Sequence, residues 1–199
     1  MTTSTSAAAS ALAEHSNAAV GTWSLDPAAS LVEFEATSFW GLAKVRGRFR
    51  TVTGTAQVEP DGRATAVLEI DVTSVDTNLS KRDEHLRTSD FLNAERHPRL
   101  EIAVRESRLD GDQRLAATGD VRLLGRTQPV RVEGLMTLTV DGRGAEMDAA
   151  AEVDARAHGM GSGLLGMVGR KVLGRAHLVF HKDPANAAAD IQADAKGGG

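Results

Sequence analysis

The chain has 199 residues, which suits one domain with tails, and it has no cysteine, which excludes disulfides, thiolate metal sites and cysteine nucleophiles. The formal net charge is −4, so the global basic field of a nucleic-acid-binding protein is absent. Aromatic residues make up only 4% of the chain, with no tyrosine, which argues against a stacking platform for bases or sugars.

Both ends of the chain have the composition of disordered tails. Residues 1–20 are mostly Ala, Ser and Thr, and residues 183–199 are poor in large apolar side chains, which leaves 21–182 as the folded domain. The first lysine or arginine is Lys44, and no apolar stretch suits a secretory signal, so we expect a cytoplasmic protein. No run approaches the ~20 apolar residues of a membrane span, so stable membrane insertion is not expected.

Alternation of apolar and polar residues dominates the domain from its start. Val32, Phe34 and Ala36 alternate with Glu33 and Glu35, a pattern typical of half-buried antiparallel strands. We predict eight such strands, with turn signals built from Gly and Asp between several of them. They are 30–37, 44–58, 64–72, 99–107, 114–124, 129–140, 146–154 and 174–182. The segment 44–58 reads as one long strand, bent at Gly47 and Gly54.

One segment breaks the alternation. Residues 78–93 are polar with Leu79, Leu86 and Phe91 interspersed, and they read as a short helix followed by a loop. Eight antiparallel strands remove their exposed edges by closing into a barrel or folding as a sandwich. An eight-stranded barrel is either filled by its own side chains or holds one small ligand.

The residues expected to face the barrel interior are often small. The alternation places ten Ala and Gly residues at inward positions. They are Ala36, Gly47, Ala66, Ala117, Gly119, Gly134, Ala149, Ala151, Gly174 and Ala176. Because an apolar void is costly, either the barrel is flattened and closed or an apolar molecule occupies it.

Three sequence features are candidate chemical sites: a glycine-rich motif, the histidines and one charged cluster. Residues 161–166 match GxGxxG, but no helix pattern of sufficient length follows, so a glycine-rich loop is favoured over a nucleotide site. The six histidines form no metal set, since even His177 and His181 would lie about 13 Å apart along a strand. Arg82, Asp83 and His85 form a cluster that reads as structural, as an anion-binding pair, or as catalytic.

The order of several motifs resembles the YceI-like (polyisoprenoid-binding) family. Trp23-Ser24-Leu25-Asp26-Pro27 and Val45-Arg46-Gly47-Arg48-Phe49 are similar to its opening motifs. Residues 74–98 resemble the most specific signature of the family. They contain S-V-D-T-N, R-D-E-H-L-R-T-S-D-F-L and Pro98. Residues 119–130 and 156–160 are similar to later motifs, so the resemblance covers about 22–181. Departures fall at Leu92, Leu123-Leu124 and His158.

The resemblance implies an all-β fold, an eight-stranded antiparallel lipocalin-like barrel with one short helix near its mouth. It also implies binding and carriage, or sequestration, of a long apolar lipid such as a polyisoprenoid or an isoprenoid quinone. Such a protein works by hydrophobic burial, at ~25 cal/mol per Å² of apolar area, and needs no cofactor, metal or catalytic group.

The candidate ligand-binding residues follow from this expectation. Apolar side chains are expected to line the cavity, and those near the mouth are expected to guard it. The lining set is Phe34, Phe49, Leu68, Ile70, Leu100, Ile102, Met147 and Phe180, and the mouth set is Phe39, Trp40, Leu86 and Phe91. Arg82 or His85 would meet a phosphate or quinone oxygen of the head group.

Two other functions stay open at this stage. One is a stress-linked interaction protein with a collapsed, ligand-free barrel. The other is a small hydrolase that uses Asp83 and His85. The expected partner is an amphiphilic lipid rather than nucleic acid, and the sequence leaves a homodimer open.

Overall fold

The computed structural model describes residues 19–38, 43–109, 113–139, 141–160 and 168–184. These residues form eleven strands, the helix α2 (Ser80–Arg87) and the 3-10 turn η1 (Val72–Ser74). The strands are β1 (Gly21–Leu25), β2 (Leu31–Ser38), β3 (Ala43–Phe49), β4 (Val52–Val58), β5 (Ala64–Asp71), β6 (Val75–Asp76), β7 (Arg99–Leu109), β8 (Arg114–Leu123), β9 (Arg126–Leu138), β10 (Gly144–Asp154) and β11 (Val168–Lys182). No helix in these ranges is long and apolar enough to cross a membrane.

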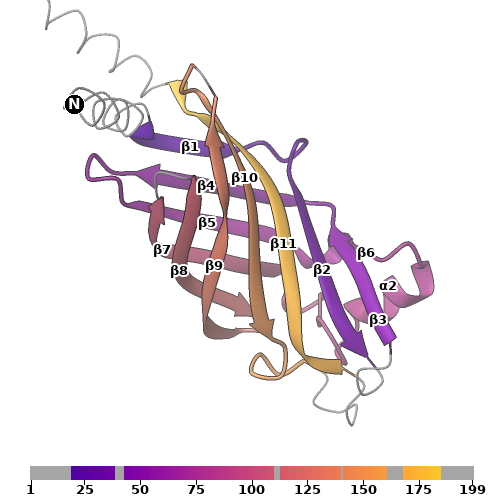
Figure 1. Cartoon of the computed structure of the whole chain (residues 1–199). Coiled ribbons are helices and arrows are strands. Elements are labelled where there is room, and N and C mark those ends of the chain that lie inside the picture. Colours follow the sequence, from indigo (N-terminus) through magenta and orange to yellow (C-terminus); the bar gives the residue numbers. More distant parts are fainter. Residues whose placement is uncertain (1–18, 39–42, 110–112, 140, 161–167, 185–199) are drawn as a thin grey trace, which may run out of the picture.

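Eight of the strands close into an antiparallel barrel. They neighbour one another in the order β1-β4-β5-β7-β8-β9-β10-β11, and β11 returns to pair with β1. Figure 1 shows this wall of strands, with β2, β3, β6 and α2 gathered on one side. The predicted all-β, eight-stranded barrel with one short helix is therefore confirmed.

The closing strand β11 explains how the remaining strands attach. One edge of β11 pairs with β10 from Lys171 to His181. Its other edge is shared, since β2 pairs with the segment 168–177 and β1 pairs with the segment 180–182. The sheet then continues from β2 to β3 and β6, which extends the barrel wall on the side where α2 lies (Figure 1).

The barrel has two distinct ends. We call the end where β5, β8 and β10 finish, and where α2 packs on β6, the helix end. The opposite end, where turns join β4 to β5, β7 to β8 and β9 to β10, is the hairpin end. The predicted helix and loop of 78–93 correspond to α2 and the segment after it, at the helix end.

The prediction of a single strand over 44–58 is wrong. The chain forms β3 and β4, which lie in different parts of the sheet, since β3 pairs with β2 and β6 while β4 pairs with β1 and β5. The break falls at Arg50 and Thr51, whose backbone N–H groups donate to the carbonyl and hydroxyl oxygens of Ser74. Hydrogen bonds to η1 thus replace the sheet bonds there. The predicted set of strands also lacked β1.

The predicted domain limits stay a prediction. The residues expected as tails, 1–20 and 183–199, lie largely outside the described ranges.

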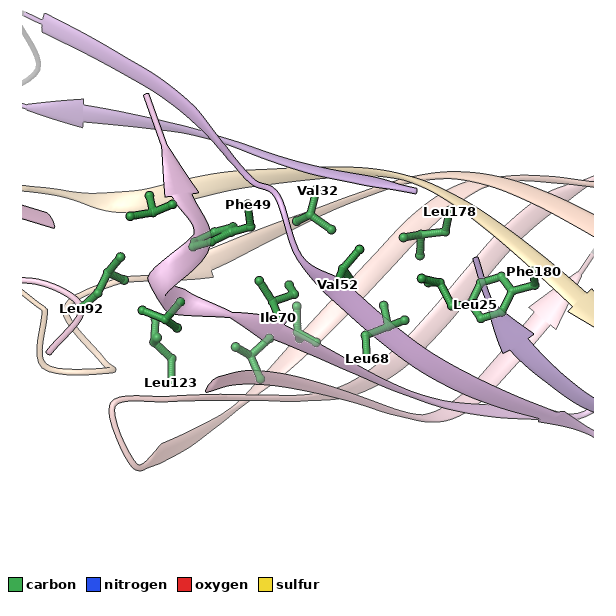
Figure 2. Close-up of a cluster of buried hydrophobic side chains, with 14 of the residues drawn as sticks. Leu25, Val32, Phe49, Val52, Leu68, Ile70, Leu92, Leu123, Leu178 and Phe180 are labelled. Atoms are coloured by element: carbon green, nitrogen blue, oxygen red, sulfur yellow. The ribbon is translucent and has the colours of Figure 1, made fainter. Parts of the chain in front are cut away.

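The packed core lies inside the barrel. Figure 2 shows side chains from several strands converging, with Val52 beside Ile70, its register partner on β5. Ile70, Val52, Val121 and Leu178 are each no more than 2% exposed. Because these residues occupy the apolar positions of alternating strands, the period-two pattern accounts for the core.

Candidate functional site: an apolar cavity inside the barrel

A cavity of about 580 Å³ runs through the barrel interior. Its wall takes residues from all eight barrel strands and from β2 and β3. At the helix end the wall includes Arg82 and His85, and at the hairpin end it includes Gly62 and Leu109. The volume falls within the roughly 300–1,000 Å³ typical of small-molecule sites.

Small residues create the space. Where a core strand normally points Val, Leu or Ile inward, these strands repeatedly place alanine on the wall. The lining alanines include Ala36, Ala56, Ala64, Ala66, Ala117, Ala149, Ala151 and Ala176. Of the glycines expected to point inward, Gly174 lines the cavity. Gly47, Gly119 and Gly134 do not line it. The inward alanines of the sequence analysis therefore face the cavity.

The structure brings ten of the twelve predicted apolar residues together on this wall. They are Phe34, Phe49, Leu68, Ile70, Leu86, Phe91, Leu100, Ile102, Met147 and Phe180. Phe39 and Trp40 lie outside the described residues. Contact of any of these side chains with a ligand stays a prediction.

The ten residues divide into two groups by burial. Phe49, Leu68, Ile70 and Phe180 are at most 7% exposed and belong to the packed core. The others, such as Ile102, are half-buried, because part of their surface faces the cavity. A substitution in the first group would therefore test stability before it tested ligand binding.

Phe34 is fixed in the wall by a glycine on the next strand. Gly47 stands directly opposite Phe34 in the β2–β3 register. A Cβ atom at Gly47 would lie 2.5 Å from Cζ of Phe34 and 2.7 Å from Cγ2 of Thr77. The ring of Phe34 also packs on Phe49, with centroids 5.4 Å apart. Gly47 thus leaves the room that the aromatic pair occupies.

The helix α2 is attached to the strand before it through Asp83. This buried carboxylate accepts hydrogen bonds from the backbone N–H of Thr77, at 2.8 Å, and from the Thr77 hydroxyl. Arg82 Nε donates to Thr77 Oγ1, and its Nη2 donates to the Thr77 carbonyl, each at 2.7 Å. Arg87 donates in the same way to the carbonyls of Thr73 and Val75. Asp83 and both arginines therefore hold the helix in place.

His85 lies on the exposed side of the helix end. Its ring meets the edge of Phe91 at a centroid distance of 4.8 Å, and its Nε2 lies 4.0 Å from Asp90. No hydrogen bond joins His85 to Asp83 in the part of the chain that the structure describes. In the same ranges, no three His, Asp or Glu side chains gather closely enough to hold a metal ion.

His158 is a buried histidine at the same end of the barrel. It is 1% exposed, and its Nδ1 lies 3.1 Å from the carbonyl oxygen of Arg126, an arrangement that suits a proton on Nδ1. Its Nε2 has no hydrogen-bond partner among the described residues. Ala155 and Met160, on the same turn, line the cavity. This departure from the family motif is thus accommodated as a packed residue beneath the turn.

Sequence reasoning missed several wall residues. Trp23 lines the cavity from β1, whose five residues give too short an alternation to be noticed alone. Val45, Val132, Leu138 and Met160 also line it. Val45 could have been found, since it lies two residues from Gly47 and four from Phe49 in the same alternation.

The fold and the cavity define a lipocalin-like barrel with an apolar interior. The family model of the YceI-like domain matches residues 23–180, and the chain belongs to this family. Protein YceI of Escherichia coli O157:H7 is 37% identical over 95 residues, which are 47% of this chain and 49% of that protein. A UPF0312 protein of Vibrio campbellii is 31% identical over 98 residues, or 48% of this chain and 52% of that one. The aligned segments thus span about half of these relatives.

Solved structures share the fold at low sequence identity. BcnA of Burkholderia cenocepacia is similar with a TM-score of 0.69 and 19% identity, over 78% of this chain and 98% of that one. A polyisoprenoid binding domain from Saccharophagus degradans, implicated in plant cell wall breakdown, has a TM-score of 0.65 and 16% identity. That match covers 81% of this chain and 98% of the other.

Proposed function

We propose that this protein binds a long apolar lipid, a polyisoprenoid or an isoprenoid quinone, in the barrel cavity and carries or sequesters it. The observation that carries the proposal is the apolar cavity of about 580 Å³ lined by alanines and aliphatic side chains. The ligand is held by burial of its apolar surface, so the protein needs no bond-making group.

The energetics of the empty barrel support an apolar occupant. At about 24 cal/mol per Å³, a cavity of 580 Å³ that was closed and dry would cost roughly 14 kcal/mol. That is at the upper end of the ~5–15 kcal/mol that stabilises a whole domain. An apolar ligand that fills the space removes this cost, whereas water gains few polar partners on such a wall. The similar fold of a polyisoprenoid binding domain supports the same ligand class.

We place the polar head group of the ligand at the helix end of the cavity. Arg82 and His85 are the ionisable wall residues contributed by α2. Thr77 engages Nε and Nη2 of Arg82, and Nη1 has no partner among the described residues. We infer that Nη1 of Arg82 or the His85 ring donates to a head-group oxygen while the tail extends toward Leu109.

Two alternatives receive less support. A hydrolase would need Asp83 and His85 to act together, yet Asp83 is committed to Thr77 and His85 lies beside Asp90 and Phe91. A collapsed, ligand-free barrel predicts no cavity, whereas this barrel holds a large one.

A pair of alanine substitutions tests the proposal. Ala66 faces the cavity from β5, and Ala116 lies exposed on the outer face of β8. Ala66→Phe fills part of the cavity, and Ala116→Phe adds the same side chain outside it. Binding of a long-chain isoprenoid quinone is followed by quenching of tryptophan fluorescence, because Trp23 lies in the cavity wall. We expect Ala66→Phe to weaken binding at least about tenfold, or ~1.4 kcal/mol.

The control and the contradicting result are clear. Ala116→Phe should bind like the unmodified protein, and thermal unfolding should show that both variants are folded. Equal affinity in a folded Ala66→Phe variant would contradict a cavity-bound ligand.

A further inference from the structure

One strand carries a row of basic residues on its outer face. Lys44, Arg46 and Arg48 alternate along β3, and Arg50 follows at the same spacing. Alternate residues of a strand point to the same side, about 6.7 Å apart. The residues between them, Val45 and Phe49, line the cavity. The basic side chains therefore lie on the outer surface of the same wall.

These four cations share only two carboxylates. Glu35 forms ion pairs with Lys44, at 3.0 Å, and with Arg46, at 2.8 Å. Asp76 forms ion pairs with Arg48, at 2.9 Å, and with Arg50, at 2.8 Å. The other carboxylates in lysine and arginine ion pairs of the described residues each hold a single cation, as in Arg63–Asp61 and Arg108–Glu106. The β3 face is thus different in having two cations for each acid.

Both shared acids stay ionised. Hydrogen bonds from Arg46 and Lys44 lower the pKa of Glu35 below its ordinary value. The pKa of Asp76 is lowered by the backbone N–H of Asn78 and by Arg48. The charge of this face is consequently stable at neutral pH, and the basic side chains are 40–75% exposed.

The strand on the far side of β2 adds to the excess of positive charge. Arg175 on β11 is exposed and has no carboxylate within ion-pair distance among the described residues. Its register neighbour on β2 is Glu33. We call Lys44, Arg46, Arg48, Arg50, Arg175 and the acids Glu33, Glu35 and Asp76 the basic face. Its net charge is +2, on a chain whose formal net charge is −4.

The basic face lies beside the helix end of the cavity. Its strand β3 pairs with β6, and α2, which carries Arg82 and His85, packs on β6. Figure 1 shows β3, β6 and α2 together on one side of the molecule. A surface that attracts the basic face would therefore also approach the end of the cavity where we place the head group.

We propose that the basic face docks the protein on the surface of a bilayer that contains anionic lipids, with the helix end of the cavity toward the head groups. The bilayer is favoured over other polyanions because it is also the source or destination of an apolar ligand. In that respect the inference rests on the proposed function. Anionic head groups attract cations near the membrane surface, and salt screens the attraction.

Cosedimentation with vesicles tests the docking. The vesicles contain equal parts of phosphatidylcholine and phosphatidylglycerol, or phosphatidylcholine alone. The double variant Lys44→Gln, Arg50→Gln removes the surplus cations and leaves the pairs Arg46–Glu35 and Arg48–Asp76 intact. At about fivefold per cation, we expect its affinity for the anionic vesicles to fall about 25-fold.

A second double variant with the same change in charge is the matched control. Arg63→Gln, Arg108→Gln removes two exposed cations of the hairpin end, and it should bind the vesicles nearly as well as the unmodified protein. Equal losses in both variants, equal binding to neutral vesicles, or binding to a DNA duplex in preference to the anionic vesicles would overturn the proposal.

Quinone binding in the absence of vesicles separates this inference from the proposed function. Lys44→Gln, Arg50→Gln should keep the affinity of the unmodified protein in that assay. If the double variant loses vesicle docking but keeps quinone binding, the result supports the basic face as the docking surface. If the unmodified protein and all variants bind quinone but none docks on vesicles, the docking proposal is overturned and the proposed function stands.

Discussion

At the scale of single residues, Asp83 shows how one side chain fixes the geometry of the candidate site. The buried carboxylate accepts both polar hydrogens of Thr77, the backbone N–H and the hydroxyl. The helix that it anchors carries Arg82, His85 and Leu86 to the cavity wall. Although the motif R-D-E-H suggests chemistry, the contacts of Asp83 are those of a structural residue.

This structural role predicts the behaviour of Asp83→Asn. The amide keeps the shape of the carboxylate but loses the charge that strengthens two hydrogen bonds, so we expect unfolding to become easier by about 1–3 kcal/mol. Chemical denaturation measures the change. Ester hydrolysis that Asp83→Asn abolishes without a loss of stability would show instead that Asp83 is catalytic.

Residue burial also sets what the sequence could and could not predict about the site. Ile70 and Ile102 occupy the same kind of inward position, and the alternation predicted both as lining residues. Ile70 is 2% exposed and packed, whereas Ile102 is half-buried at the cavity. That difference depends on which residues face them across the barrel, and no local pattern contains it.

At the scale of elements, one carboxylate, that of Asp154, holds the turn after β10 in place. Asp154 accepts hydrogen bonds from the backbone N–H groups of Arg156 and Ala157, both at 3.0 Å, and pairs with Arg170 at 2.7 Å. This turn carries the buried His158 and the wall residue Met160. Asp154 thus connects β10 and β11 at the helix end of the cavity.

The turn should respond to acid through Asp154. The Arg170 side chain, with the backbone N–H of Ala157, lowers the pKa of Asp154 from its usual 3.8. Since the pKa is lower in the folded state, the stabilisation is complete above the unfolded value and is lost as pH falls through the folded pKa. We expect the difference in unfolding free energy between the protein and Asp154→Asn to shrink below about pH 4.

Thermal unfolding of both proteins from about pH 3 to 6 measures this difference. Asp26, Asp61, Asp76 and Asp141 also have lowered pKa values, so the two proteins must be compared at each pH. A difference that stayed constant over the whole range would contradict the role of the Asp154–Arg170 pair.

Elements were predicted unequally well from the sequence. The helix over 80–87 and most barrel strands follow local patterns. The break between β3 and β4 does not, because Arg50 and Thr51 bond to Ser74, more than twenty residues away. Long-range partners of this kind decide where a strand changes neighbours. The sequence carries only a shift in the phase of the alternation at the break, from Val45 and Phe49 to Val52 and Ala56.

At the scale of the whole molecule, the barrel combines a packed core with an apolar cavity. Large side chains such as Leu178 and Phe180 fill part of the interior, and alanines leave the rest open. The small inward residues left a closed barrel and a hollow one equally open, and the structure shows a cavity that the inward alanines line. Its length, from Arg82 at the helix end to Leu109 at the hairpin end, required the structure.

The measurement that tests the central claim most directly is mass spectrometry of a lipid extract from the loaded protein. The natively folded protein is incubated with membrane lipids that contain polyprenyl alcohols and isoprenoid quinones, repurified, extracted with solvent and analysed beside Ala66→Phe. We predict about one prenyl-chain lipid per chain in the unmodified protein and little in the variant. An extract without such lipids from the unmodified protein, or equal amounts from both proteins, would contradict the account.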